Sequence, residues 1–392
     1  MHFILDSNLA IFVFLPVYWF MSYFFVTGIS ISLFLAVILL TKKRKYTADF
    51  ILSGLLIFAA QTIFHSFLLE TGLYLTCPDL FVLGFPSPII VAVFLYLYTR
   101  YQTHNIQFQW RELWHFLPAA VIFLIYTNFF FLSHSRKLAV MQSEGAGYEF
   151  ENLLRIGVIY ISGIVYSFLS LRILFKYRRN IKNEFSNTER IEFNWLVFLI
   201  IGILTIWLIV LFGQSEKLIS TSSTIFVILL GYFGITQVNV FGSKVAAVST
   251  VILINDEKQK GPDILYRPVK YQYSNLSEDE SLQIHEQLLK ILEREKPFLN
   301  SELTLAELAK LIPTHPNKLS EVINKYEQKN FYDLINERRI QEFFRLLNMP
   351  ENKQYTLMSL AFDCGFNSKA SFNRNFKKYT GKTPTEYQNS QG

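Results

Sequence analysis

The sequence has little charge and almost no cysteine. Charged residues make up 17% of its 392 residues, whereas an average soluble protein has about 25%. Two cysteines are too few for a disulfide-stabilised scaffold. Intrinsic disorder is excluded as well, because 51% of the residues are hydrophobic and the net charge is only +6.

Charged residues are absent from seven long stretches of the first 243 residues, which are 7–41, 50–69, 80–99, 113–135, 156–171, 193–215 and 218–243. A helix needs about 20 apolar residues to cross a membrane. The fifth stretch is short, but Arg155 and Arg172 at its ends can reach the headgroups. We therefore predict that residues 1–243 form a polytopic transmembrane helix bundle of about seven spans. The first stretch is long for one span and short for two.

Basic residues in the loops predict the orientation of these spans. Apart from Arg155 and Arg172 at the ends of the fifth stretch, eleven Lys and Arg residues follow the first, third and fifth stretches, and three follow the fourth and sixth. Because loops rich in Lys and Arg stay in the cytoplasm, we expect the N-terminus outside and the C-terminus in the cytoplasm. No basic residue precedes the first apolar run, so no cleaved signal peptide is expected. Cys77 and Cys364 then lie in different compartments and are expected to be free.

The composition changes after residue 243. Residues 256–275 are polar and contain Gly261, Pro262 and Pro268, which predicts a juxtamembrane linker at residues 244–276. Apolar residues at helical spacing predict that residues 277–392 form a small all-helical domain. Its helix starts are marked by three S/T-x-x-E capping boxes and two prolines, which are Ser277 with Glu280, Thr304 with Glu307, Thr383 with Glu386, Pro316 and Pro384.

Two places in this domain are typical of a helix, a tight turn and a second helix. In the second turn, Gly365 suits a position with positive φ, and Phe366 can fold beneath the turn into the core. The first unit is predicted as helices 305–311 and 316–326, the second as helices 357–363 and 369–379, with one long helix at 331–348 between the units.

These units carry a known pattern. The second contains Leu360-Ala361-Phe362-Asp363-Cys364-Gly365-Phe366-Asn367-Ser368, then Phe372-Asn373-Arg374-Asn375-Phe376-Lys377-Lys378, then Gly381 and Pro384. The first contains Leu308-Ala309, Leu319-Ser320 and Phe331–Ile340. Over residues 292–387 the chain resembles the AraC-type DNA-binding domain. The resemblance implies a bacterial regulator whose two helix-turn-helix units read adjacent major grooves of double-stranded DNA.

The predicted DNA-contacting face is clearest in the second unit. Residues 353–382 include six basic residues and one acidic residue. At helical spacing, Lys369, Asn373 and Lys377 share a face, and Phe372 and Phe376 point toward the core. A solvated face is the alternative, but the turn pattern and the resemblance favour DNA contact. The predicted contacts of this unit are Lys369, Ser371, Asn373, Arg374, Lys377 and Lys378.

The first unit has a less basic set of candidates, which are Asn317, Lys318, Ser320 and Glu321. Glu321 would repel phosphate unless it accepts a hydrogen bond from a cytosine amino group. A solvated face explains any one of these residues equally well. Arg338 and Arg339, in the helix between the units, are candidates for pinning that helix to the DNA backbone or to its own core.

Polar residues inside the second predicted span form a candidate signal-binding site. Gln61 and His65 are four residues apart and share a helix face, and Glu70 lies at the outer edge. Polar groups inside a membrane usually face the bundle interior and have a function. The alternative is that they join helices by hydrogen bonds.

The sequence indicates a membrane-bound one-component transcription regulator and not an enzyme. The histidines have no metal-ligand spacing, there is no Gly-rich phosphate loop, and no cofactor is expected. The expected location is the bacterial inner membrane. The expected partners are double-stranded DNA, the lipid bilayer and a small-molecule or protein signal, with a homodimer left open. The alternative function is a membrane receptor or transporter whose tail is a protein-interaction module.

Overall fold

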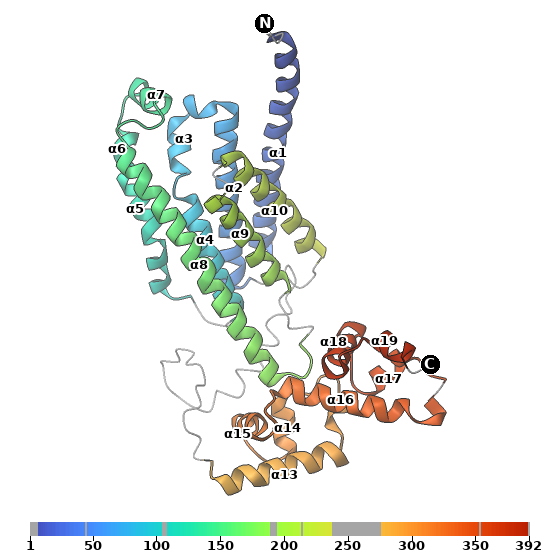
Figure 1. The fold of residues 1–392 in the computed structure, drawn as a ribbon. Coiled ribbons are helices and arrows are strands. Elements are labelled where there is room, and N and C mark those ends of the chain that lie inside the picture. The colour runs from blue at the N-terminus through green and yellow to red at the C-terminus, as the bar shows by residue number, and fades with distance from the viewer. Residues whose placement is uncertain are drawn as a thin grey trace. The chain divides into compact units, whose positions relative to one another are not determined.

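The computed structural model describes residues 7–43, 45–103, 108–188, 194–212, 215–236, 276–352 and 354–390. Within these ranges the regular elements are helices, apart from one isolated β-bridge, which confirms the predicted all-α class. The chain divides into two compact units (Figure 1). Unit 1 comprises Met1–Phe175 and Phe193–Asp256, and unit 2 comprises Lys176–Glu192 and Glu257–Gly392. The predicted linker, residues 244–276, lies outside the described residues except for Leu276.

Unit 1 is built from long apolar helices that lie side by side (Figure 1). Six segments are long and apolar enough to cross a membrane, namely Met21–Thr41, Thr47–Thr71, Pro78–Thr103, Glu149–Glu184, Trp195–Phe212 and Glu216–Phe233. The described elements are α1 (Ser7–Thr41), α2 (Thr47–Thr71), η1 (Leu73–Leu75), α3 (Pro78–Leu83), α4 (Ser87–Thr103), η2 (Trp110–Phe116), α5 (Leu117–Ile125), α6 (Thr127–Phe130), α7 (His134–Gln142), α8 (Glu149–Glu184, which continues into unit 2), α9 (Asn194–Phe212) and α10 (Glu216–Thr236).

The first and fourth charge-free stretches bear on the number of spans, whereas the third is divided between α3 and α4 but still forms one candidate span. Residues 7–41 form one uninterrupted helix, so the first stretch is a single helix and not two. The fourth stretch, 113–135, is divided among η2, α5, α6 and α7, because the backbone leaves the α-helical conformation at Tyr126 and the next helix ends after Phe130. The described residues therefore contain six long apolar helices where the sequence predicted about seven spans. In Figure 1 the short helices follow one another alongside α8.

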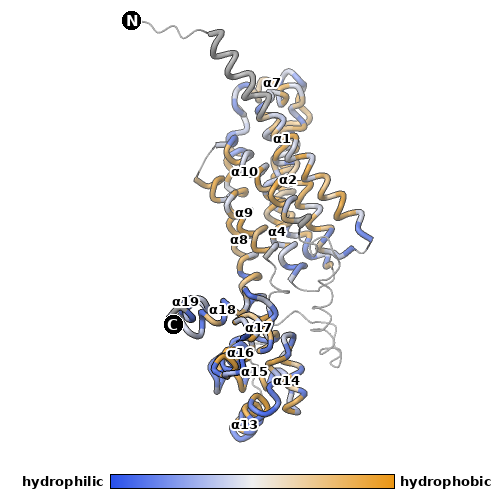
Figure 2. The backbone as a smooth tube through the Cα atoms, turned by 90° about the vertical axis from the view of Figure 1, so that its right-hand side faces the viewer, coloured by the Kyte–Doolittle hydropathy of each residue, from blue (hydrophilic) through white to orange (hydrophobic). Residues whose placement is uncertain are grey.

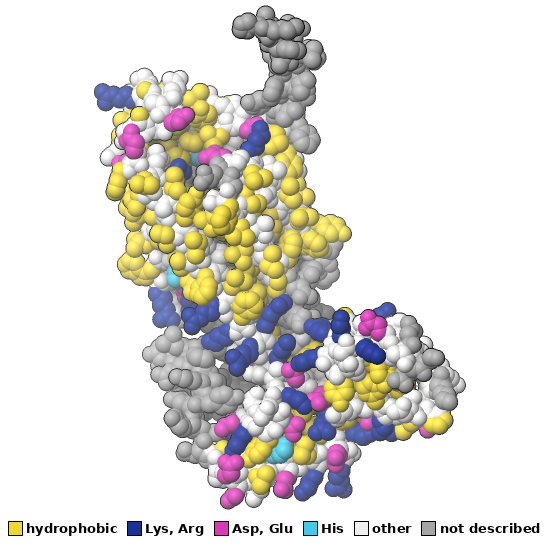
Figure 3. Space-filling view, in the orientation of Figure 1, with side chains coloured by type: hydrophobic (Ala, Val, Ile, Leu, Met, Phe, Trp, Pro, Cys, Tyr) yellow, Lys and Arg dark blue, Asp and Glu magenta, His cyan; other side chains and the backbone are white. Residues whose placement is uncertain are grey.

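The outer surface of unit 1 is apolar. In the six long segments only 28–56% of the most apolar window is buried inside the protein. Large side chains such as Phe168 and Phe212 are exposed, by 64% and 81%. Figure 2 shows the apolar character of these helices, and Figure 3 shows the visible face as a broad apolar band. An apolar surface of this size is suited to lipid, because in water it would drive aggregation.

Inside unit 1 the helices approach closely. A Cβ atom at Gly202 of α9 would lie 2.0 Å from the ring of Phe226 in α10, so only glycine allows this contact. Trp195 of α9 donates a hydrogen bond of 3.3 Å to the Tyr98 hydroxyl of α4. Small residues and interhelical hydrogen bonds are the usual means by which membrane helices pack.

Unit 2 contains the C-terminal helices together with the end of α8. The helices predicted at 305–311 and 357–363 have the predicted bounds, and those at 331–348 and 369–379 differ by one residue. The helix predicted at 316–326 is divided, because its last turn is π-helical. The described elements are α13 (Glu278–Arg294), η3 (Pro297–Leu299), α14 (Leu305–Leu311), α15 (Pro316–Val322), η4 (Ile323–Glu327), α16 (Phe331–Leu347), η5 (Pro350–Asn352), α17 (Leu357–Asp363), α18 (Lys369–Thr380) and α19 (Pro384–Asn389).

The predicted helix caps are present with one difference. Thr304 with Glu307 and Thr383 with Glu386 form complete capping boxes, and Pro316 and Pro384 occupy first-turn positions. Ser277 accepts a hydrogen bond from the Glu280 amide, but the Glu280 carboxylate instead binds the Lys318 ammonium at 2.6 Å. The capping box of Ser277 and Glu280 is therefore half formed, because a long-range ion pair holds its acidic residue.

Helix α16 belongs to two hydrophobic cores. Its N-terminal half, with Phe331 and Ile335, packs in the core of the first helix-turn-helix unit together with α13, α14 and α15. Its C-terminal half, with Ile340 and Phe343, packs in the core of the second unit together with α17 and α18. A single helix thus sets the spacing between the two units, as the sequence predicted.

Candidate nucleic-acid interface

The second helix-turn-helix unit consists of α17, the turn at residues 364–368 and α18. Gly365 has φ of +90°, and a Cβ atom there would lie 2.5 Å from the Phe298 carbonyl oxygen. Phe366 is buried beneath the turn, and its ring centroid lies 5.4 Å from that of Phe372. The Ser368 hydroxyl caps α18 by accepting a hydrogen bond from a backbone amide at 3.0 Å. These contacts fix the direction in which α18 leaves the turn.

Helix α18 has one buried and one exposed face. Phe372 and Phe376 are each 1% exposed, as predicted. The exposed face carries most of the predicted DNA-contacting side chains, since Lys369, Arg374, Lys377 and Lys378 are exposed and Asn373 is half-buried. Ser371 is different, because it is buried next to the N-terminal cap of the helix. The residues on the open surface are therefore four cations and one amide.

Two contacts fix α18 against α16. Asn375 is buried and donates a hydrogen bond of 2.9 Å to the hydroxyl of Tyr332. The Lys378 ammonium lies 2.6 Å from an Asp333 carboxylate oxygen. Lys378 is consequently neutralised in part, whereas no ion pair involves Lys369 or Lys377 within the described ranges.

The first unit consists of α14, the turn at residues 312–315, and α15 continued by η4. Leu319 and Val322 are fully buried, so α15 also has one face in the core. Asn317 is exposed, and Ser320 and Glu321 are half-buried. Lys318 is tied to the acidic first turn of α13 by its ion pair with Glu280. The open side of α15 therefore offers mostly uncharged polar groups.

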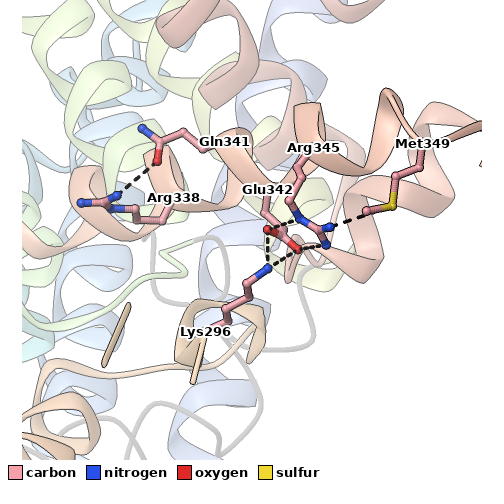
Figure 4. A network of polar contacts seen from close by, with 6 residues as sticks. All are labelled: Lys296, Arg338, Gln341, Glu342, Arg345 and Met349. Atoms are coloured by element: carbon pink, nitrogen blue, oxygen red, sulfur yellow. Dashed lines mark hydrogen bonds and ion pairs between the residues drawn. The ribbon is translucent and has the colours of Figure 1, made fainter. Parts of the chain in front are cut away.

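The two arginines of α16 have different roles. Arg338 lies at the surface, where it donates a hydrogen bond of 3.4 Å to Gln341 (Figure 4). Arg339 is 2% exposed and donates hydrogen bonds of 2.8 Å to the carbonyl oxygens of Phe298 and Asn300. Burial lowers the pKa of Arg339 from its ordinary value to about 10. Of the two alternatives predicted for Arg339, the structure gives packing within the domain core.

A charged network joins α16 to the turn before η3. Figure 4 shows the Glu342 carboxylate between Lys296 and Arg345, with hydrogen bonds of 2.8–2.9 Å and 2.6–2.9 Å respectively. The hydrogen bonds from Arg345, and then those from Lys296, lower the pKa of Glu342. The network fixes the C-terminal half of α16, on which the second unit packs.

Comparison with known proteins identifies this part of the chain. Residues 308–390 match the family model described as a helix-turn-helix domain, of the AraC type. This segment is an AraC-type helix-turn-helix domain. The match covers both turns, α16 and α19, and it begins inside α14. No curated protein and no solved structure matches the chain.

Outside the AraC-type domain, the three predicted signal-binding residues are all on α2 but do not form one cluster of contacts. His65 stacks on the ring of Phe81, with centroids 4.0 Å apart, and its Nδ1 lies 3.2 Å from the Phe81 carbonyl oxygen. Glu70 forms an ion pair of 2.9 Å with Lys217 of α10. Gln61 is half-buried. The Glu70 contact favours the alternative that such groups join helices.

Two features near these sites were not found by sequence reasoning. Arg155 was interpreted only as a residue at the end of a span, yet its guanidinium lies 4.1 Å from the ring centroid of Phe85, and its buried Nε has no hydrogen-bond partner within the described residues. The sequence does not predict a role for Ser186, because nothing in the local sequence distinguishes it from other loop residues. It lies against the AraC-type domain, where it bonds to Leu303.

Proposed function

We propose that the protein is a membrane-anchored, one-component transcription regulator that binds promoter DNA through its AraC-type domain. The observation that carries the proposal is the exposed cationic face of α18, set beside a turn that matches the family, in the same chain as six long apolar helices. Cations bind phosphates, and Arg and Asn side chains can read base edges in the major groove.

The proposed DNA contacts are the residues that reach the open surface. In the second unit these are Lys369, Asn373, Arg374 and Lys377, with Lys378 available if it leaves Asp333. In the first unit they are Asn317, Ser320 and Glu321, and Lys318 can contribute only by leaving Glu280. Ser371 is not included, because a buried side chain cannot contact a base.

Unit 1 is proposed to anchor the regulator in the bacterial inner membrane and to receive the signal. The distribution of basic residues in its loops supports a cytoplasmic C-terminus, where DNA is accessible. His65 and Gln61, together with Arg155, are the proposed signal-responsive groups, since charged and polar side chains inside a bundle are costly to keep without a function. A homodimer would double the number of half-sites read.

The proposal is tested with the full-length protein in lipid nanodiscs. A pool of random-sequence DNA duplexes is selected at low salt, and enrichment of one bipartite sequence is the expected result. Arg374→Ala should weaken binding and relax specificity at one position if Arg374 reads a base, whereas a uniform loss with the salt slope reduced by about one would mark a phosphate contact. Arg294→Ala, at an exposed position of α13, is the control. No enrichment with the intact protein would contradict the proposal and favour a protein-interaction role for the tail.

A further inference from the structure

The loop that follows α8 is part of the unit that contains the AraC-type domain. Residues 149–175 of α8 belong to unit 1, and residues 176–184 belong to unit 2. Just beyond α8, Phe185 forms an antiparallel β-bridge with Thr304, the N-cap residue of α14. A segment distant in sequence therefore adds to the domain through its backbone, in the manner of a short added strand.

Ser186 is the centre of this contact. It is 1% exposed, its amide donates a hydrogen bond of 3.2 Å to the Leu303 carbonyl oxygen, and its hydroxyl donates one of 2.7 Å to the same oxygen. Next to it, Asn187 is also buried, and its side-chain amide nitrogen lies 3.4 Å from a Glu302 carboxylate oxygen. We call residues 185–188 the docking segment.

The docking segment is recognised by two polar side chains of α16. Asn336 donates a hydrogen bond of 3.0 Å to the Ser186 carbonyl oxygen. The Arg339 guanidinium lies 3.4 Å from the same oxygen and donates a hydrogen bond of 3.1 Å to the Ser186 hydroxyl. Both side chains are at most 2% exposed. Two buried polar groups that point at one peptide form a built site for it, because each of them loses hydrogen bonds when the segment is absent.

Arg339 connects the docking segment to both helix-turn-helix units. The same guanidinium that binds Ser186 also binds the Phe298 carbonyl oxygen, against which Gly365 of the second turn packs. Asn336 and Arg339 lie between the halves of α16 that pack in the two cores. Ser186 also holds Leu303, the residue before the cap of the first unit. Removing the segment would affect both units at their junction.

We propose that the docking segment is the input contact of the AraC-type domain, through which α8 controls the geometry of α16 and hence the spacing of the two DNA-binding units. The docked state is the DNA-competent state, because it adds hydrogen bonds to Asn336 and Arg339 and orders the junction. This inference rests on the proposed DNA-binding function. It gives the signal a route through α8 that does not depend on the linker at residues 244–276.

The experiment uses the full-length protein in lipid nanodiscs. Ser186→Pro removes the amide that bonds to Leu303 and prevents docking, whereas Ser186→Ala removes only the hydroxyl contacts. Ser143→Ala is the matched control, because among the described residues that exposed hydroxyl bonds only to nearby carbonyl oxygens of its own helix. Docking is measured by oxidising a Phe185→Cys/Thr304→Cys pair, since residues paired across a β-bridge are close enough for a disulfide.

Readouts are the disulfide yield, hydrogen exchange of α16, and affinity for a DNA duplex selected by the wild-type protein. The disulfide should form readily when the cysteine pair is placed in the otherwise wild-type chain, and poorly when Ser186→Pro is added. Ser186→Pro should accelerate exchange around residues 336–340 and weaken DNA binding at least about tenfold, with a smaller loss for Ser186→Ala and none for Ser143→Ala. Oxidation of the cysteine pair in the Ser186→Ala background should restore the affinity for DNA. If Ser186→Ala instead weakened binding through a folding defect, oxidation would not restore it.

Two results would overturn the inference. One is a cysteine pair that does not form a disulfide in the otherwise wild-type chain, which would show that the segment is not docked. The other is Ser186→Pro with low disulfide yield but wild-type DNA affinity, which would show that docking does not control binding. If the wild-type protein bound no DNA, the proposed function would fail, and the disulfide and exchange measurements would still decide whether the segment docks and orders α16.

Discussion

Single residues at the junction of the AraC-type domain are fixed by contacts from several elements. Gly365 faces the Phe298 backbone, Cys364 beside it is completely buried, and Glu342 is held by two cations. Burial raises the pKa of the Cys364 thiol to about 12, so its reactive thiolate is almost absent at neutral pH. Alkylation of this thiol therefore reports whether the second unit is folded.

Gly365→Ala should destabilise the second unit by more than about 2 kcal/mol, because alanine is strained at positive φ and its Cβ would meet a backbone carbonyl that cannot move independently. Gly381→Ala is the control. Gly381 also has positive φ, but no described residue lies within 4 Å of its Cβ position, so only the backbone strain of about 1 kcal/mol applies. The measurement is the urea dependence of Cys364 alkylation, followed by mass spectrometry. Equal midpoints for the two variants would contradict the contact with Phe298.

Glu342→Gln should lower the free energy of unfolding at neutral pH by about 2 kcal/mol, because the carboxylate accepts charge-assisted hydrogen bonds from Arg345 and Lys296. The pKa of Glu342 is lower in the folded protein, so its contribution is complete above its unfolded pKa and is lost as the pH falls through the folded pKa. The difference between variant and wild type should therefore shrink in acid. Glu351→Gln, at an exposed position, is the matched control.

At the scale of single elements, α18 is a helix whose exposed cations are not equivalent. Lys377 and Lys378 are neighbours in sequence, but among the residues that the structure describes only Lys378 has an ion pair, with Asp333 of α16. A lysine that must break an ion pair with a carboxylate before it binds a phosphate contributes less to the free energy of DNA binding. The ion pair also lies on the exposed surface, where such pairs contribute little to stability.

Lys377→Ala should therefore weaken DNA binding more than Lys378→Ala, and it should reduce the dependence of log K on log salt by about one. Lys378→Ala should have a smaller effect on both quantities, because the wild-type ammonium is already neutralised in part by Asp333. Fluorescence anisotropy of a labelled duplex at several salt concentrations provides the measurement. A larger loss for Lys378→Ala would mean that DNA displaces Asp333.

At the scale of the whole molecule, the side on which unit 2 lies depends on how many times unit 1 crosses the bilayer. Six helices are long enough, and the fourth charge-free stretch is divided into short helices. The distribution of Lys and Arg agrees with the positive-inside rule only if that stretch also crosses the membrane. Otherwise the basic residues after α4 and those at the end of α8 would lie on opposite sides of the membrane. Broken helices can cross where neighbouring helices shield their backbone.

A reporter inserted before Phe108 should therefore lie in the cytoplasm, and one inserted at Gly145, in the turn between α7 and α8, should lie outside. A reporter fused after residue 390 should lie in the cytoplasm. Paired fusions to green fluorescent protein and alkaline phosphatase measure the side directly. If the first two insertions lie on the same side, the fourth stretch does not cross, and the predicted orientation is wrong for part of the chain.

Local signals in the sequence determined the apolar helices, the helix caps, both turns and the two faces of α18. Each of these depends on residues within a few positions of one another, such as Gly365 with Phe366 or Thr304 with Glu307. Periodicity and capping chemistry therefore suffice to predict them.

Only the tertiary structure decided which polar groups meet across long distances in the chain. It directed Glu280 to Lys318 rather than to its own cap, buried Ser371, divided the fourth stretch and joined Ser186 to Arg339. The last contact joins residues 153 positions apart. Such contacts follow from the desolvation and geometry of groups brought together by folding, and no local pattern encodes them.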